Sequence, residues 1–91
     1  MKYFVDSQFE RLYKKLGFQR QEQIKRAISE LLAFFDSGVK TEGLGLKKLR
    51  KDYWEIRSTL KERILFSLQD DIVRFILVGD HESIRRFLKS H

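Results

Sequence analysis

The clearest periodic pattern in the sequence is helical. Apolar residues recur every three or four positions from Ile24 to Phe35. Polar residues repeat on the opposite side of the same stretch, at Gln21, Lys25, Ser29 and Asp36. This spacing predicts an amphipathic helix whose apolar stripe packs into the core. Gly38 follows the last apolar position and is well placed to end this helix.

A shorter helix is predicted before it. Lys2–Asp6 is a short run that favours a strand. Ser7, with Glu10 three residues later, matches a capping box at the start of a helix. Phe9–Leu16 then carries apolar residues at helical spacing, and Gly17 suits the position just after the helix end. The first part of the chain is therefore predicted as a strand followed by two helices.

The pattern changes to a period of two after a glycine-rich loop at Asp36–Gly45. From Leu46 onward, alternate residues divide between two faces of a strand. One face carries Tyr53, Glu55 and Arg57, and the other carries Trp54, Ile56 and Ser58. Ser58–Lys61 is predicted as a turn, and the alternation then resumes in a second strand from Arg63 to Leu68.

The end of the chain predicts one more strand and a helix. Asp70 and Asp71 form a tight turn that leads into Ile72–Val78, the most apolar run, interrupted only by Arg74. A last short helix is predicted at Glu82–Lys89, capped by Asp80 or Ser83. Helices followed by a run of strands are typical of the α+β class with an antiparallel sheet. We therefore expect one small domain, 1–91, with two N-terminal helices on one face of the sheet and the other face free for cations.

Composition limits the possible functions. The chain has no cysteine, which excludes a disulfide framework, a thiolate nucleophile and a cysteine-based zinc site. No apolar run is long enough to span a bilayer, and the first residues do not resemble a signal peptide, so a cytoplasmic protein is expected. The net charge is +6 and the isoelectric point is about 9.8, values that favour nucleic acid, an acidic protein or an anionic surface as partner.

The positive charge is concentrated where the strands begin. Seven cations and three anions lie within Leu46–Arg63, so this stretch carries +4 of the total. Cations repeated on strands, with His81 after a third strand, predict a surface that binds a phosphate chain and cuts it. Arginine binds phosphate oxygens through two parallel hydrogen bonds, and Arg57 and Arg63 lie on adjacent predicted strands.

The order and spacing of several motifs resemble a known family. The string K-L…Y-x-E-I-R…R-I-L-F…V-G-D-H is similar to the RelE/ParE superfamily of bacterial type II toxins, and within it to the RelE-like, ribosome-dependent mRNA endonucleases. The likeness covers nearly the whole chain and is best from Gly45 to Leu88. It implies a β-α-α-β-β-β-α fold, no metal or other cofactor, and action on mRNA at the ribosome. It also implies a cognate antitoxin that forms a hetero-oligomer with the toxin and neutralises its basic face.

The resemblance also implies roles for individual residues. The catalytic set would be Lys48, Arg57, Arg63 and His81. Further RNA contacts would come from Lys47, Arg50, Lys51, Tyr53, Arg85 and Phe87. Phe87 stands where some family members have a tyrosine, so it can stack on a base but offers no hydroxyl for proton transfer.

Metal-independent RNA cleavage explains why such residues are needed. The 2′-hydroxyl attacks the phosphorus, so a group must accept its proton, cations must stabilise the charged intermediate and an acid must protonate the leaving 5′-oxygen. Histidine side chains serve as general acids and bases, so His81 suits either proton transfer, while Lys48 could serve as the base.

Other interpretations of the same residues stay open. Arg63 could pair with Glu55 across the hairpin, Asp80 is better explained as a helix cap than as a partner of His81, and Trp54 belongs to the core. Two other functions also fit the sequence. One is a ParE-like toxin that inhibits DNA gyrase without catalysis, and the other is a basic binding module that has lost its activity.

Overall fold

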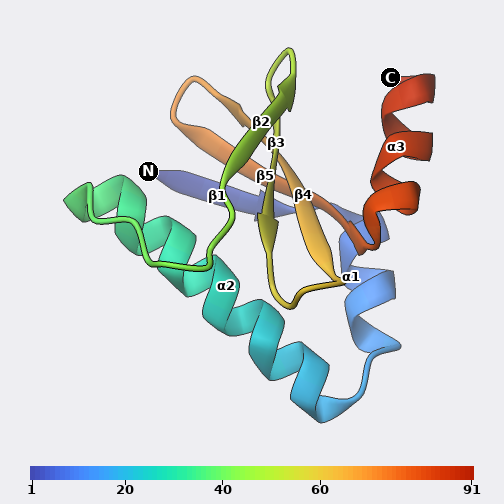
Figure 1. The fold of residues 1–91 in the computed structure, drawn as a ribbon. Coiled ribbons are helices and arrows are strands. Elements are labelled where there is room, and N and C mark those ends of the chain that lie inside the picture. The colour runs from blue at the N-terminus through green and yellow to red at the C-terminus, as the bar shows by residue number, and fades with distance from the viewer.

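The computed structural model describes residues 1–91, which form three helices and five strands (Figure 1). In chain order these are β1 (Lys2–Val5), α1 (Ser7–Lys14), α2 (Phe18–Ser37), β2 (Lys47–Arg50), β3 (Tyr53–Arg57), β4 (Arg63–Gln69), β5 (Ile72–Gly79) and α3 (His81–Ser90). The predicted α+β class is confirmed. None of the helices combines the length and the apolar character that a membrane crossing requires.

The sheet has one more strand than the sequence pattern predicts. Its order is β1-β5-β4-β3-β2. The pairs β3–β4 and β4–β5 are antiparallel as predicted, β2 also pairs antiparallel with β3, and β1 lies parallel to β5 at the edge. The stretch from Leu46 to Ser58, predicted as one strand, folds back at Lys51, whose φ of 51° lies in the left-handed region. This turn makes a hairpin in which Lys47 pairs with Glu55.

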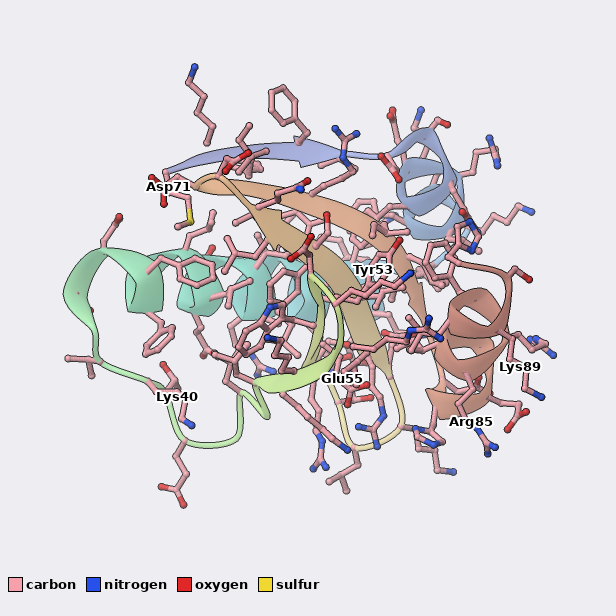
Figure 2. The ribbon with its side chains drawn as sticks, turned by 90° about the horizontal axis from the view of Figure 1, so that it is seen from above. Lys40, Tyr53, Glu55, Asp71, Arg85 and Lys89 are labelled. Carbon is pink, nitrogen blue, oxygen red and sulfur yellow. The ribbon has the colours of Figure 1, made fainter.

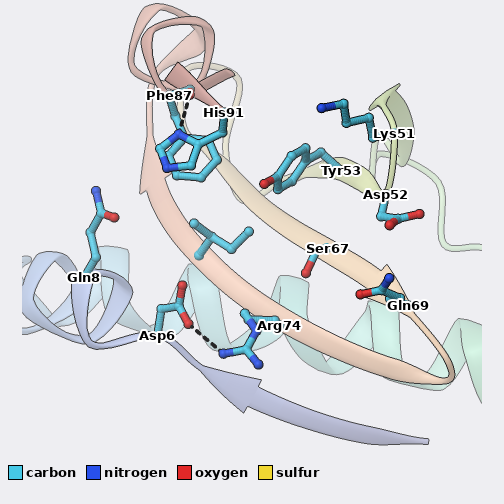
Figure 3. Close-up of a pocket in the computed structure, with 11 residues that line it drawn as sticks. Asp6, Gln8, Lys51, Asp52, Tyr53, Ser67, Gln69, Arg74, Phe87 and His91 are labelled. Carbon is cyan, nitrogen blue, oxygen red and sulfur yellow. Dashed lines mark hydrogen bonds and ion pairs between the residues drawn. The ribbon is translucent and has the colours of Figure 1, made fainter. Parts of the chain in front are cut away.

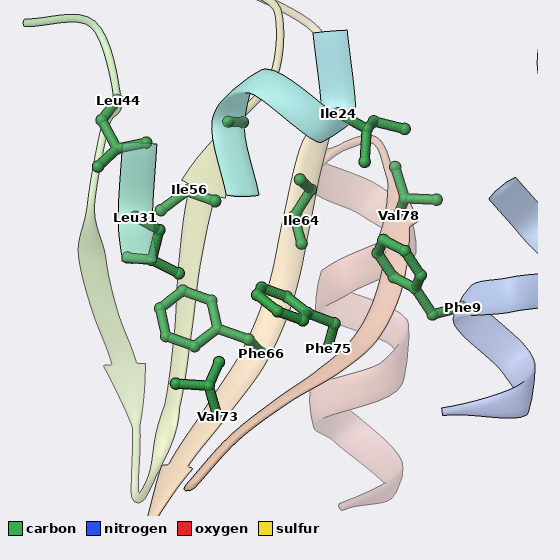
Figure 4. Packing of buried hydrophobic residues seen from close by; sticks show 11 residues of the cluster. Phe9, Ile24, Leu31, Leu44, Ile56, Ile64, Phe66, Val73, Phe75 and Val78 are labelled. Carbon is green, nitrogen blue, oxygen red and sulfur yellow. The ribbon is translucent and has the colours of Figure 1, made fainter. Parts of the chain in front are cut away.

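The main core lies between the sheet and the first two helices, as predicted. Phe9 from α1 and Ile24 and Leu31 from α2 pack with strand residues that alternate along β3, β4 and β5, among them Phe66 and Phe75 (Figure 4). Trp54 packs against this cluster, which confirms its predicted place. We call this side of the sheet the α2 face. Because alternate strand residues point to opposite faces, the strand residues between these core positions point away from α2.

The sequence predicts that the opposite face of the sheet is free. This prediction is wrong, because α3 covers part of that face. Ile84 of α3 packs on Leu65, Ile76 and Leu77, and these four side chains form a second buried cluster. We call this side of the sheet the α3 face. The apolar side of a ten-residue helix needs a partner surface, and an apolar patch around β4 and β5 provides it. The cations must therefore lie around α3.

Local signals identified some helix ends correctly and others wrongly. Gly38 ends α2 with a φ of 77°, and its N–H donates to the carbonyl of Phe34. The predicted capping box is wrong: Asp6 is the N-cap of α1, without a side-chain hydrogen bond, and Ser7 is already helical. Gly17 begins α2 instead of ending α1, because the two helices follow one another almost directly.

Asp80 caps α3 and links the stability of this helix to pH. Its carboxylate accepts hydrogen bonds from the backbone N–H of Ser83, at 2.9 Å, and from the Ser83 hydroxyl, at 2.8 Å. These bonds lower the pKa of Asp80 below its ordinary value of 3.8. Since the folded-state pKa is depressed, the cap stabilises the protein above that ordinary value, and the stabilisation is lost as pH falls through the folded-state pKa.

We therefore expect Asp80→Ala to lower the urea midpoint at about pH 7, and the difference from the wild type to narrow as pH falls below 3.8 and this carboxyl becomes protonated. Asp80→Asn is the control, because an amide oxygen still caps the helix but does not titrate. An Asp80→Ala difference that does not change with pH would contradict a charged cap.

Candidate functional site

Arg57 and Arg63 lie side by side, as the sequence predicts. They are directly paired residues of β3 and β4. Both belong to the α3 face, because the pair two residues along, Glu55 and Leu65, includes a residue of the buried cluster under α3. Arg63 also pairs with Gly79 of β5. One row of residues thus crosses this end of the sheet, from Arg57 through Arg63 to Gly79, and His81 begins α3 two residues beyond it.

Arg63 is held in place by a buried carboxylate. Its Nη1 lies 2.7 Å from Oε2 of Glu55, whose side chain is only 3% exposed, while that of Arg63 is 18% exposed. This confirms the predicted cross-hairpin pair. The Nε–H of Arg63 is buried and has no hydrogen-bond partner. A guanidinium has five N–H donors, and Glu55 engages only part of this set. Arg63 is therefore fixed in orientation and keeps donors for another ligand.

Arg57 is exposed and forms no ion pair with a carboxylate. Its side chain packs along Gly45, whose φ of 65° lies in the left-handed region. A Cβ at Gly45 would lie 2.9 Å from Cγ of Arg57, closer than side chains tolerate. The backbone N–H of Arg57 also donates to the carbonyl of Leu44, at 2.8 Å, so the loop and the strand hold each other. The loop thereby positions an unpaired guanidinium.

Gly45→Ala should have two separate effects on this arrangement. The left-handed conformation should cost about 1–2 kcal/mol of unfolding free energy, and the new methyl group should push the Arg57 side chain away. Urea denaturation would measure the first effect, and the NMR resonance of the Arg57 Nε–H group the second. Gly17→Ala is the matched control, because nothing lies near a Cβ there and its φ is −70°. An unshifted Arg57 resonance would contradict the contact.

Lys48 lies on the wrong side of the sheet for a shared site with the arginines. It pairs with Trp54, and its Nζ lies 5.9 Å from the centre of the Trp54 ring, on the α2 face. Lys47 pairs with Glu55 instead and so belongs to the same face as Arg57 and Arg63. A register shift between Lys48 and Arg50 breaks the alternation of β2 at this point. The geometry therefore places Lys47 with the arginines.

The side chain of His81 is exposed and makes no hydrogen bond within the chain. Asp80, next to it, is engaged by Ser83, as the interpretation as a helix cap predicted. Two more of the cations suggested for RNA contacts lie at α3, and Figure 2 shows Arg85 there. Arg50 donates to the carbonyl of Leu88 at 3.3 Å, and Arg85 lies 3.7 Å from Glu82 of its own helix. No three histidine, aspartate or glutamate side chains lie close enough together to share a metal ion.

Tyr53 and Phe87 meet at the other end of α3, beside a cavity of about 440 Å³ (Figure 3). Their rings pack edge to face, with centroids 5.7 Å apart. Lys51 lines the same cavity, so three of the residues suggested for RNA contacts are brought together. We call it the Phe87–His91 pocket. It is lined by Asp6, Gln8, Lys51, Asp52, Tyr53, Ser67, Gln69, Arg74, Ile76, Phe87 and His91.

His91 and Arg74 also line this pocket, although the sequence predicts neither as a site residue. The His91 ring lies parallel to that of Phe87, with centroids 3.9 Å apart, and its Nδ1 lies 2.8 Å from the Phe87 carbonyl oxygen. The spacing of four residues puts both rings on one side of a helix, so the sequence did contain this signal. Arg74 pairs with Asp6 of the chain's first turn at 3.1 Å, a contact that no local pattern reveals.

No protein-family model and no curated sequence matches the chain. Solved structures do match. In the RelB–RelE antitoxin–toxin complex from Methanococcus jannaschii the matching chain superposes with a TM-score of 0.67 at 20% identity, over 92% of this chain and 96% of that one. The chain has the RelE-toxin fold.

Two further structures carry the same RelE-toxin fold. In the E. coli DinJ–YafQ complex the matching chain gives a TM-score of 0.71 at 16% identity, covering 91% of this chain and 96% of that chain. In the YoeB–YefM complex from Staphylococcus aureus the matching chain gives a TM-score of 0.62 at 23% identity, covering 89% of this chain and 97% of that chain. The chain thus spans nearly the full length of these proteins, and the RelE-like architecture predicted from the sequence is confirmed.

Proposed function

We propose that this chain is the toxin of a type II toxin–antitoxin pair and that it cleaves mRNA on the ribosome. The observation that carries the proposal is the row of Arg57, Arg63 and Gly79 on the α3 face of a RelE-type fold, with His81 directly after it. Two guanidinium groups in register, one free and one held by Glu55, are suited to grip a single phosphodiester.

The chemistry would proceed by attack of the ribose 2′-oxygen on phosphorus. The new P–O2′ bond forms as the P–O5′ bond breaks, which leaves a 2′,3′-cyclic phosphate and a free 5′-hydroxyl. Arg57 and Arg63 would stabilise the extra negative charge of the intermediate, and Lys47 would add a third positive group from the same face. His81 would transfer one of the two protons, since histidine is the side chain that most often serves as a general acid or base.

The antitoxin would bind the basic surface around α3. Structures with this fold include complexes titled RelB–RelE, DinJ–YafQ and YoeB–YefM. The chain's charge of +6 favours a partner with an acidic or amphipathic segment that follows the sheet and α3. Toxin and antitoxin would form a hetero-oligomer in the cytoplasm, where ribosomes and mRNA are found.

The decisive experiment combines expression with purified components. Controlled expression in bacteria should stop growth, and mapping of mRNA ends should show new cuts within translated regions. Purified protein should cut mRNA only when ribosomes are present. Growth arrest with intact mRNA would refute the nuclease. A gyrase supercoiling assay then tests the ParE-like alternative, and the absence of any toxicity would favour a basic binding module without catalysis.

A further inference from the structure

The buried polar residues of the chain all lie in the hairpin that carries Arg57 and Arg63. They are Glu55, Ser58 and Glu62. Glu55 pairs with Arg63, whereas Ser58 and Glu62 directly adjoin the two arginines in the turn between β3 and β4. A buried ion pair adds little stability, because apolar side chains of similar volume fill the same space without the cost of removing charges from water. The concentration of these groups beside the arginines is therefore better explained by the geometry that they impose.

Glu62 is the centre of a buried set of contacts between this turn and α2. Its side chain is only 6% exposed, and its carboxylate forms an ion pair with Arg20 of α2. The Ser58 hydroxyl donates to the same carboxylate at 3.3 Å, and the Ser58 backbone N–H donates to the Glu62 carbonyl at 3.0 Å. Arg26, also of α2, donates to the Ser58 carbonyl at 3.0 Å. We call these four residues the Glu62 cluster. It fastens the turn to the first half of α2 (Figure 1).

The Glu62 cluster lies on the opposite side of the sheet from the two arginines. Arg57 and Arg63 pair directly and belong to the α3 face. Because successive residues of a strand alternate between faces, their neighbours Ser58 and Glu62 point toward the α2 face, where the contacts from α2 reach them. The cluster therefore does not touch a phosphate that the two guanidinium groups hold. It fixes the backbone at the place from which both guanidinium groups extend.

We propose that Glu62 and Arg20 are positioning residues for mRNA cleavage, a role that rests on the proposed function. Through the turn between β3 and β4 they set the spacing and orientation of the Arg57 and Arg63 guanidinium groups. Catalysis requires the reacting groups to be held close to the transition-state geometry, and a displacement of about 1 Å can lower the rate roughly 100-fold. The planar donors of arginine make orientation as important as distance. The Glu62 carboxylate is engaged by Arg20 and Ser58, so this role needs no contact with the RNA.

Cleavage kinetics of ribosome-bound mRNA test this role in the full chain. Arg20→Ala and Glu62→Gln should each lower kcat roughly 10- to 100-fold and leave KM within a few-fold, because the alignment is lost while the contacts to bound RNA remain. Arg20→Lys keeps the charge and should restore part of the rate. Lys25→Ala is the matched control: it removes the same charge from α2, but its ion pair with Glu22 is exposed, so kcat should equal that of the wild type. Urea denaturation should verify that each variant is folded.

NMR of the purified chain without ribosomes gives a second measurement that does not depend on cleavage. Arg20→Ala should shift the Nε–H resonances of Arg57 and Arg63, although Arg20 makes its hydrogen bond to Glu62 and not to either arginine. Lys25→Ala should leave both resonances unchanged. A residue that contributes only stability would not move them in a folded variant. In the double variant Arg20→Ala/Glu62→Gln, kcat should fall no further than in the more affected single variant, because the two residues act as one unit.

The outcomes separate the positioning role from the nuclease itself. If the wild type cuts mRNA and both Arg20→Ala and Glu62→Gln cut at the wild-type rate, the positioning role is overturned and the nuclease stands. A loss in Arg20→Ala that appears only in KM would assign Arg20 to RNA binding and also overturn the role. Losses that multiply in the double variant would show that the two residues act separately. A wild-type chain that cuts no mRNA would refute the nuclease, while shifted arginine resonances in Arg20→Ala would still support the geometric link.

Discussion

Arg57→Ala should lower the rate of mRNA cleavage by about 100- to 1,000-fold, the usual effect of removing one group that stabilises charge in the transition state. Arg57 is exposed, has no carboxylate partner and adds nothing to either buried cluster. Its loss should therefore leave the unfolding free energy within about 0.5 kcal/mol of the wild type. The measurement is single-turnover cleavage of ribosome-bound mRNA, alongside urea denaturation of the same preparation.

Lys48→Ala provides a matched control for Arg57→Ala. It removes the same charge from the neighbouring strand, but on the α2 face, where Lys48 lies over Trp54. We expect its cleavage rate to stay within a few-fold of the wild type. The cleavage rate of Arg57→Lys should lie between those of Lys48→Ala and Arg57→Ala, because an ammonium keeps the charge but loses the planar pair of donors. Equal losses in Lys48→Ala and Arg57→Ala would indicate general charge attraction in place of a specific phosphate contact.

Phe75→Ala should destabilise the fold by about 3–5 kcal/mol, which is the range for removing a buried phenyl ring and leaving a cavity. Phe75 is fully buried and joins four elements. Its ring centroid lies 6.1 Å from those of Tyr3 in β1, Phe9 in α1 and Phe66 in β4. Domains of this size have a total stability of only about 5–15 kcal/mol, so the variant should be partly unfolded at moderate temperature.

Urea denaturation at 25 °C would measure the loss for Phe75→Ala. Phe18→Ala is the control, because its ring is 77% exposed and its removal should change the stability by no more than about 0.5 kcal/mol. The stability loss of Phe75→Leu should lie between those of Phe75→Ala and Phe18→Ala, since leucine keeps most of the buried volume. A loss below about 1 kcal/mol in Phe75→Ala would mean that the surrounding rings close the cavity and that this residue does not hold β1 and α1 to the sheet.

Much of the fold could be predicted because its signals are local. The apolar stripe of α2, the alternation along β3 and β4 and the left-handed turn at Asp70 and Asp71 each depend on residues close in sequence. The parallel pairing of β1 with β5 depends on residues about 70 positions apart, and the turn at Lys51 has no glycine to mark it. Periodicity describes which side of an element is buried but not which element lies beside it.

The candidate site could likewise be predicted only in part. The alternation of β3 and β4 was sufficient to bring Arg57, Arg63 and Glu55 to one face, because a period of two determines the face of every residue in a regular strand. The same period carried back to Leu46 also puts Lys47 on this face, whereas Lys48 was assigned to the site by the family resemblance and lies on the opposite face. The period could not place Arg50, since the irregular step between Lys48 and Arg50 brings Arg50 opposite Tyr53 and arises only when β2 pairs with β3.

The sequence by itself determined the class of the fold, the helical core stripe and the placement of two arginines on one face of the sheet, since each follows from spacing along the chain. Only the tertiary structure decided that Arg50 reaches α3, that α3 covers part of the face that carries the arginines, and that His91, Phe87, Tyr53 and Arg74 surround one pocket. Contacts between distant segments depend on strand order and helix placement, which no local period encodes.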